Sequence, residues 1–284
     1  MSAKIIDGKE ISRAVREEWR QRVDKLKDKG VLPGLAVIIV GDNPASRLYV
    51  RNKIKACHES GLHSEVHDMP EDASEEMVLN QIEELNQSAN IHGILVQLPL
   101  PTNINENKVL ETILASKDVD GFHYHNIGAL VTGNMIFPPC TPYGVMCMLD
   151  YMDIPIEGKE AVVVGRSNIV GKPMAIMLLE KSATVTICTS RTQDLKAHTS
   201  RADILVVATG RAEMITGDMI KEGATVIDVG INHDDDGRLV GDVEFESASQ
   251  KAGYITPVPG GVGPMTITIL VANTVLSAER FSAL

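Results

Sequence analysis

Residues 161–173 read AVVVGRSNIVGKP: an apolar run, a glycine turn at Gly165, and a second glycine at Gly171 where a helix can open. Glycine allows a backbone to come close to a pyrophosphate, and the amino end of the following helix favours negative charge. The spacing differs from G-x-G-x-x-G, so this stretch alone is also compatible with an ordinary tight turn. Further strand and helix units follow it, as a nucleotide-binding domain of the Rossmann type requires.

Apolar runs of strand length recur along the chain and alternate with helical stretches. β-branched runs separated by helices indicate parallel sheets covered on both faces, and therefore an α/β fold. The expected strands are residues 35–40, 93–96, 161–164, 184–188, 204–208 and 225–229.

The length of 284 residues suits two domains. The pair Pro138–Pro139 precedes Thr141 and Pro142, which are suited to the N-cap and the first turn of a helix. We therefore place the domain boundary between residues 138 and 139. The final helix, from about residue 265 onward, is expected to pack back on the first domain.

Composition argues against several kinds of partner. The formal net charge is -11 and no Lys/Arg cluster forms a basic face, so a nucleic-acid partner is not expected. The amino terminus lacks the apolar core of a secretory signal, and no run of about 18 apolar residues predicts a membrane span. The four cysteines form no C-x-x-C pair, which favours a reducing, cytoplasmic location.

No metal site is expected. His63 and His67 are four residues apart, but they flank an expected strand and no carboxylate motif supports them. Residues 232–237 resemble the start of an EF-hand loop, yet Val243 stands at the twelfth position, where that loop needs Glu. Asp236–Gly237 is better interpreted as a hairpin turn.

The end of the expected strand 184–188 bears on the choice of coenzyme. NAD sites usually place Asp or Glu there to bind the ribose 2′-hydroxyl, but Thr189, Ser190, Arg191 and Thr192 follow this strand. Ser190, Arg191 and Arg166 are suited to a 2′-phosphate instead. This pattern predicts NADP rather than NAD, although a lone arginine in a loop is more often only a solvated cation.

A second candidate site lies far earlier in the chain, in residues 43–53. If this stretch is helical, Tyr49 and Lys53 share one face, with Ser46 one turn before them. A lysine in a partly dry pocket has its pKa drawn toward neutrality, which makes it a useful acid or base. Taken alone, such a pair is more often a surface lysine beside a core tyrosine. Short-chain dehydrogenases also carry Y-x-x-x-K, but there it follows the coenzyme glycines.

Six long motifs occur in order: VGDNPAS at 40–46, GILVQLPLP at 93–101, KDVDGFH at 117–123, PCTP at 139–142, GRSNIVGKP at 165–173 and TPVPGGVGPMT at 256–266. With these motifs the chain resembles the bifunctional methylenetetrahydrofolate dehydrogenase/cyclohydrolases over almost its whole length. The resemblance implies oxidation of 5,10-methylenetetrahydrofolate by NADP+, followed by hydrolysis of the methenyl product to 10-formyltetrahydrofolate. It also implies a homodimer and a cleft between the two domains that serves both steps.

The resemblance assigns residues 1–138, completed by the helix 267–284, to a folate-binding catalytic domain, and residues 139–266 to a Rossmann-like NADP-binding domain. It implies that Lys53 is the essential lysine, that Gln97 tunes it, that Tyr49 stacks on the substrate's aminobenzoyl ring and that Asp120 binds the pterin. The implied folate-binding residues are Ser46, Tyr49, Gln97, Leu98, Pro99, Asp120, Pro259, Gly260 and Gly261. The implied NADP-binding residues are Gly165, Arg166, Ser167, Ile169, Val170, Ser190, Arg191, Thr192, Ala208, Thr209, Gly210, Gly230, Ile231 and Thr266.

Three positions depart from the family pattern: Tyr124, where proline is common, Thr189, where histidine is common, and Arg211–Ala212, where the family often has x-Pro. Two other functions stay open at this point. One is a monofunctional dehydrogenase of the same fold, and the other is a non-enzymatic NADP-binding regulator.

Overall fold

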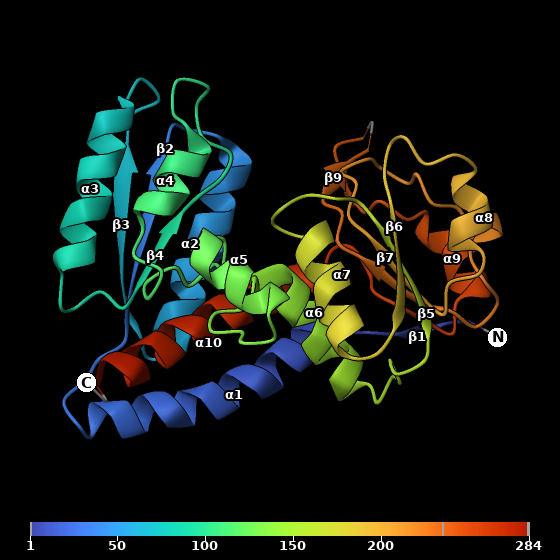
Figure 1. Cartoon of the computed structure of the whole chain (residues 1–284), viewed down its shortest axis with the longest axis horizontal. Helices are drawn as coiled ribbons and strands as arrows, with labels where there is room; N and C mark the ends of the chain where they lie inside the picture. The colour runs from blue at the N-terminus through green and yellow to red at the C-terminus, as the bar shows by residue number, and fades with distance from the viewer. Residues whose placement is uncertain (1, 235, 283–284) are drawn as a thin grey trace. The chain divides into compact units, whose positions relative to one another are not determined.

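The structure is a computed structural model that describes residues 2–234 and 236–282 (Figure 1). The chain divides into two compact units. Unit 1 comprises Met1–Arg13 and Thr141–Thr266, and unit 2 comprises Ala14–Cys140 and Ile267–Leu284. Each unit contains a parallel β-sheet with helices packed against it, so the expected α/β fold class is confirmed.

The first domain was expected to span residues 1–138, but the structure differs at the amino terminus. Residues before Ala14 group with unit 1. The reason is strand β1 (Lys4–Ile5), which pairs in parallel with β11 (Tyr254–Ile255) at one edge of the unit 1 sheet. A strand of two residues has no hydrophobic period from which its partner can be predicted.

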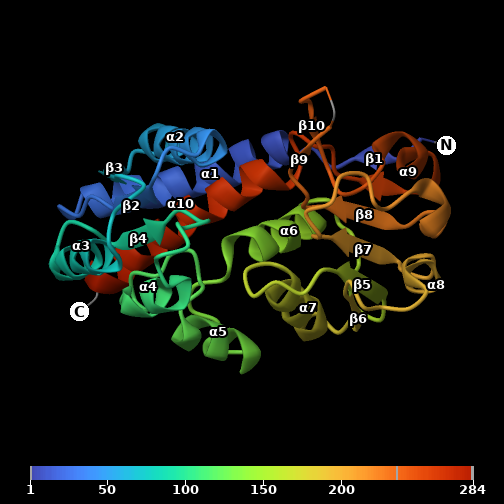
Figure 2. The ribbon, with the colours of Figure 1, turned by 90° about the horizontal axis from the view of Figure 1, so that it is seen from above.

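In unit 2, the sheet has the order β3 (His63–Met69), β2 (Gly34–Val40), β4 (Gly93–Val96). Every residue of β2 is buried, because helices cover both faces of this central strand. Figure 2 shows α2 on one side of the sheet and α3 and α4 on the other. The helices that lie wholly or mostly in this unit are α1 (Gly8–Lys27), α2 (Pro44–Glu59), α3 (Glu75–Gln87), α4 (Glu106–Thr112), α5 (Tyr124–Val131) and α10 (Val262–Ser282).

The last helix, α10, is long and apolar enough to cross a membrane, judged by length and composition alone. However, 67% of its apolar window is buried inside the fold. A core helix of a globular protein passes the same test, so α10 is weak evidence for a membrane span.

In unit 1, six parallel strands have the order β1-β11-β8-β7-β5-β6, which includes β5 (Glu160–Val164), β6 (Thr184–Cys188), β7 (Ile204–Val207) and β8 (Thr225–Asp228). β5 lies between β6 and β7, so the chain passes from β5 to β6 on one side and then crosses to β7 on the other side. Ligands of such sheets bind at this switch point, beyond the carboxyl ends of the strands. The other elements are α6 (Cys140–Tyr151), α7 (Gly171–Glu180), α8 (Leu195–Thr199), η1 (Gly217–Met219), β9 (Asn232–His233), β10 (Leu239–Val240) and α9 (Phe245–Lys251).

Two local expectations have different outcomes. The helix expected to begin at Pro142, after an N-cap at Thr141, begins two residues earlier, at Cys140, and the Thr141 hydroxyl instead forms a hydrogen bond with that of Thr266 at 3.0 Å. The predicted hairpin turn at Asp236–Gly237 is confirmed, because β9 and β10 pair in antiparallel fashion on either side of it. Asp235 lies outside the described residues.

Gly165→Ala is expected to lower the stability of unit 1. The added Cβ would lie 2.2 Å from the carbonyl oxygen of Ala208, and the backbone φ of +132° disfavours any side chain. We expect a loss of about 1–3 kcal/mol, seen as a lower midpoint of thermal unfolding. Gly158→Ala is the matched control, because its φ is +71° but its Cβ would meet no described atom within 4 Å. Equal midpoints for the two variants would contradict the steric explanation.

Candidate active site

Helix α2 carries the lysine of the predicted catalytic site. The helix begins beneath an N-cap, where the side chain of Asn43 accepts hydrogen bonds from the backbone N–H groups of Ala45 and Ser46. Tyr49 and Lys53 share one face of this helix, with the Lys53 Nζ 5.2 Å from the centre of the Tyr49 ring. The pair therefore has the geometry of a cation over an aromatic face.

Lys53 is only 6% exposed, and its Nζ donates a hydrogen bond of 3.1 Å to the Oε1 of Gln97, just after β4. The Gln97 Nε2 donates to the carbonyl of Leu98 at 2.7 Å. That second bond orients the amide so that its oxygen, rather than its nitrogen, faces the lysine. The interpretation of Lys53 as a plain surface lysine is therefore wrong.

Burial controls the electrostatics around Lys53. It lowers the pKa of Lys53, while the nearby Asp120 carboxylate acts in the opposite direction. It raises the pKa of Asp120, which Lys53 partly offsets. Burial also raises the pKa of the Cys140 thiol, which contacts Asp120, and that of Cys57 to about 12. The pKa values of Lys53 and Asp120 therefore both move toward neutrality, as proton transfer in water requires, whereas those of the two thiols move away from it.

Two residues that the sequence did not single out hold the segment around Asp120. The buried carboxylate of Asp118 accepts hydrogen bonds from the backbone N–H groups of Gly121 and His123, at 3.1 and 2.8 Å. From α10, the Nδ2 of Asn273 donates to the carbonyls of Val119 and Pro138, at 2.8 and 3.0 Å. The last helix thus supports the loop that carries the predicted pterin-binding carboxylate.

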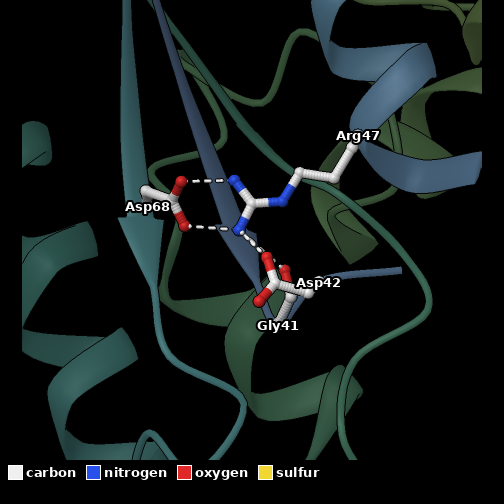
Figure 3. Close-up of polar contacts among 4 residues, drawn as sticks. All are labelled: Gly41, Asp42, Arg47 and Asp68. Carbon is white, nitrogen blue, oxygen red and sulfur yellow. Dashed lines mark hydrogen bonds and ion pairs between the residues drawn. The ribbon is translucent and has the colours of Figure 1, made fainter. Parts of the chain in front are cut away.

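Arg47 anchors the start of α2 to two strands (Figure 3). Its guanidinium makes a two-pronged contact with the carboxylate of Asp68 at the end of β3. It also donates to the carbonyl of Gly41 at 3.1 Å and to the carboxylate of Asp42 at 2.7 Å. A planar guanidinium suits such bidentate pairing, so it fixes the end of the helix that bears Tyr49.

The predicted nucleotide turn lies at the switch point of the unit 1 sheet. Gly165 follows β5, and the space for a Cβ on Gly171 is taken by the carbonyl of Gly165, 2.3 Å away. The hydroxyl of Ser167 accepts hydrogen bonds from the N–H groups of Val170 and Gly171, which open α7. Two glycines, close backbone approach and a helix amino terminus fit a pyrophosphate here.

The residues after β6 form a compact turn. The Thr192 hydroxyl accepts from the Thr189 N–H at 2.8 Å, and the Thr189 hydroxyl accepts from the Arg191 N–H at 3.1 Å. Thr189, one of the departures from the family pattern, therefore shapes the turn that carries Ser190 and Arg191. Arg166 and Arg191 are both exposed.

The other predicted coenzyme residues follow the neighbouring strands, apart from Thr266 on α10. Ala208, Thr209 and Gly210 come directly after β7, and residues 230–231 follow β8. These segments, with Gly165 and Arg191, lie at the carboxyl ends of four adjacent parallel strands. Ile169 and Val170 belong to the turn that precedes α7.

The predicted folate-binding residues are divided between the units. Ser46, Tyr49, Gln97, Leu98, Pro99 and Asp120 belong with Lys53 to unit 2. Pro259, Gly260 and Gly261 belong to unit 1. Gly261 packs tightly on Gly8, and a Cβ on Gly8 would lie 1.8 Å from the carbonyl oxygen of Gly261.

The fold and these sites define a two-domain α/β protein with a Rossmann-like nucleotide-binding unit and a second unit built around a buried lysine. Tetrahydrofolate dehydrogenase/cyclohydrolase domains match both parts: the catalytic domain over residues 6–120 and the NAD(P)-binding domain over residues 139–282. The chain therefore belongs to the tetrahydrofolate dehydrogenase/cyclohydrolase family, as its motifs predicted.

Named relatives agree with this membership. A Nitrosospira multiformis protein named bifunctional protein FolD is 66% identical over 283 residues, which cover 100% of this chain and 98% of the relative. The crystal structure of Campylobacter jejuni FolD, a methylenetetrahydrofolate dehydrogenase/cyclohydrolase, is 50% identical with a TM-score of 0.96, covering 98% and 99% of the two chains. The Trypanosoma brucei enzyme, solved with NADP and an inhibitor, is 38% identical with a TM-score of 0.96, covering both chains completely.

Proposed function

We propose that this chain is a bifunctional enzyme of one-carbon metabolism. It oxidises 5,10-methylenetetrahydrofolate to 5,10-methenyltetrahydrofolate with NADP+ and hydrolyses that product to 10-formyltetrahydrofolate. Family membership and the identity to proteins named bifunctional FolD support both activities. The observation that carries the proposal is the buried Lys53, hydrogen-bonded to Gln97 and near Asp120, because a protein that only bound a nucleotide would not need it.

The two steps make different demands on the protein. When bound, NADP+ accepts the hydride that leaves the one-carbon bridge of the folate. For this step the chain has to orient two rings, without an acid or a base. Hydrolysis of the methenyl cation consumes one water and releases one proton. A lysine with a lowered pKa suits this step, because it can take the proton from water and return it to the ring nitrogen as the C–N bond opens.

The binding roles follow the chemistry of each group. A pterin presents adjacent N–H donors, which a carboxylate such as Asp120 accepts in bidentate fashion, while Tyr49 offers a flat face to the aminobenzoyl ring. We assign this folate site to unit 2 and NADP to the carboxyl edge of the unit 1 sheet. Cysteines that form no disulfide suit a cytoplasmic enzyme, and the family resemblance favours a homodimer.

Arg191→Ala tests the coenzyme assignment. Loss of a cation that pairs with the 2′-phosphate is expected to raise the KM for NADP+ about tenfold and to leave the KM for NAD+ unchanged. Arg201→Ala is the matched control, since this exposed arginine precedes β7, at the opposite end of the strand from the predicted site. An equal rise in the KM for NADP+ and the KM for NAD+ would contradict a role for Arg191 at the 2′-phosphate.

Two separate assays test the function as a whole. NADPH formation is measured with 5,10-methylenetetrahydrofolate, and NAD+ is run in parallel. Hydrolysis is measured by supplying 5,10-methenyltetrahydrofolate without coenzyme. We expect both activities, with NADP+ preferred. NADPH formation without catalysed hydrolysis would show a monofunctional dehydrogenase, and tight NADP binding without turnover would show a regulator.

A further inference from the structure

Two carboxylates that have no part in the proposed chemistry are buried behind the coenzyme edge of the unit 1 sheet. Asp228 ends β8 and is 4% exposed, and Asp242 follows β10 and is 0% exposed. Burying two carboxylates is costly unless each is fully hydrogen-bonded. Their partners therefore indicate what they hold in place.

Asp242 accepts hydrogen bonds from three successive backbone N–H groups after β7. Its Oδ2 accepts from Thr209 at 2.5 Å and from Gly210 at 3.1 Å, and its Oδ1 accepts from Arg211 at 2.9 Å. The Nδ2 of Asn232 donates to the same Oδ1 at 2.9 Å. One side chain thus gathers three successive N–H groups of the loop that follows β7, as an anion does in a backbone nest.

Asp228 holds the backbone around Asp242. Its Oδ1 accepts from the N–H groups of Gly230 and Asp242, both at 2.9 Å, and its Oδ2 accepts from Val243 at 2.9 Å. The approach is so close that a Cβ on Gly241 would lie 1.8 Å from the Asp228 Oδ2. A Cβ on Gly230 would likewise lie 2.3 Å from the Asp242 Oδ1. The glycines at these positions are therefore required by the two carboxylates.

We propose that Asp242 is a positioning residue for the nicotinamide coenzyme: its carboxylate fixes the loop after β7 and, with Asp228, the Gly230 backbone in the conformation that binds NADP. This inference rests on the proposed function, because Thr209, Gly210 and Gly230 are its predicted coenzyme residues. Asp242 touches the loop from within the fold and acts through that backbone.

Asp242→Asn is the direct test. The amide has nearly the same shape as the carboxylate. In either orientation, however, its NH2 group replaces an oxygen that accepts from two N–H donors. We expect the KM for NADP+ to rise about 10- to 100-fold, which matches the loss of charged hydrogen bonds. Hydrolysis of supplied 5,10-methenyltetrahydrofolate without coenzyme is expected to stay within about twofold of wild type, since that chemistry is assigned to unit 2. Asp218→Asn, at an exposed aspartate paired with Lys196, is the matched control.

A wild-type KM for NADP+ in Asp242→Asn would overturn the proposal. The proposal would also be overturned if both activities fell in proportion to the fraction of folded protein. If Asp242→Asn does not fold, Asn232→Ala replaces it. That variant keeps the carboxylate and removes one of its donors, and it is expected to raise the KM for NADP+ about three- to tenfold. An unchanged KM there would contradict the proposal. Failure of the wild-type protein to reduce NADP+ would instead refute the proposed function.

Discussion

Lys53→Met is expected to abolish catalysed hydrolysis of 5,10-methenyltetrahydrofolate. Methionine retains the length and the apolar stem of lysine, but it cannot accept or return a proton. A positioned acid–base group contributes about 10²–10⁴-fold, so the rate above buffer should fall by that factor. The rate is measured from the loss of methenyl absorbance after subtraction of the uncatalysed reaction. The dehydrogenase activity of the same variant measures how far substrate geometry depends on the lysine.

The control for this variant lies on the same helix. Lys55 is 74% exposed and pairs with Glu59 one turn later, so Lys55→Met removes an exposed charge and leaves the buried Lys53 in place. It should leave both activities near wild type. Full methenyl hydrolysis by Lys53→Met, or equal loss in Lys55→Met, would refute the role of Lys53.

Asp120→Asn is expected to weaken folate binding and to change the pH profile. An amide cannot accept two hydrogen bonds from the pterin, and the loss of charged hydrogen bonds should raise the KM for folate by about 10²–10³-fold. The Asp120 carboxylate raises the pKa of Lys53, so its removal lowers that pKa further. The neutral amine then forms at lower pH, and the rising limb of the hydrolysis rate should shift to lower pH.

The matched control is Asp72→Asn, at an exposed aspartate of unit 2. We expect this control to keep the wild-type KM and pH profile. An Asp120→Asn variant that keeps its KM while its pH limb moves would separate the electrostatic role from the binding role. A variant in which neither quantity changes would contradict both roles.

The sequence predicted the parts of the fold that depend on local pattern. The strands 93–96 and 184–188 have the predicted bounds, because short β-branched runs between helices have few alternatives. The shared face of Tyr49 and Lys53 follows from helical spacing alone. The dry environment of Lys53 does not follow from this spacing, because it depends on tertiary contacts such as the hydrogen bond to Gln97, which is 44 residues away.

Long-range contacts explain what local pattern missed. The pairing of β1 with β11 moves residues 1–13 into unit 1, and nothing in those residues signals it. Asn273 and Asp242 appear in the sequence as single polar residues. Their roles arise because one donates to carbonyls 135 and 154 residues away and the other accepts from a loop about 30 residues earlier.

Whether this chain is a bifunctional enzyme is best tested by a single time course of the wild-type protein with 5,10-methylenetetrahydrofolate and NADP+, in which NADPH and every folate product are quantified. We expect NADPH to form, and 10-formyltetrahydrofolate to follow it faster than methenyltetrahydrofolate hydrolyses in buffer alone. NADPH accompanied by methenyltetrahydrofolate that decays only at the buffer rate would contradict a bifunctional enzyme, and the absence of NADPH would contradict an enzyme of this kind altogether.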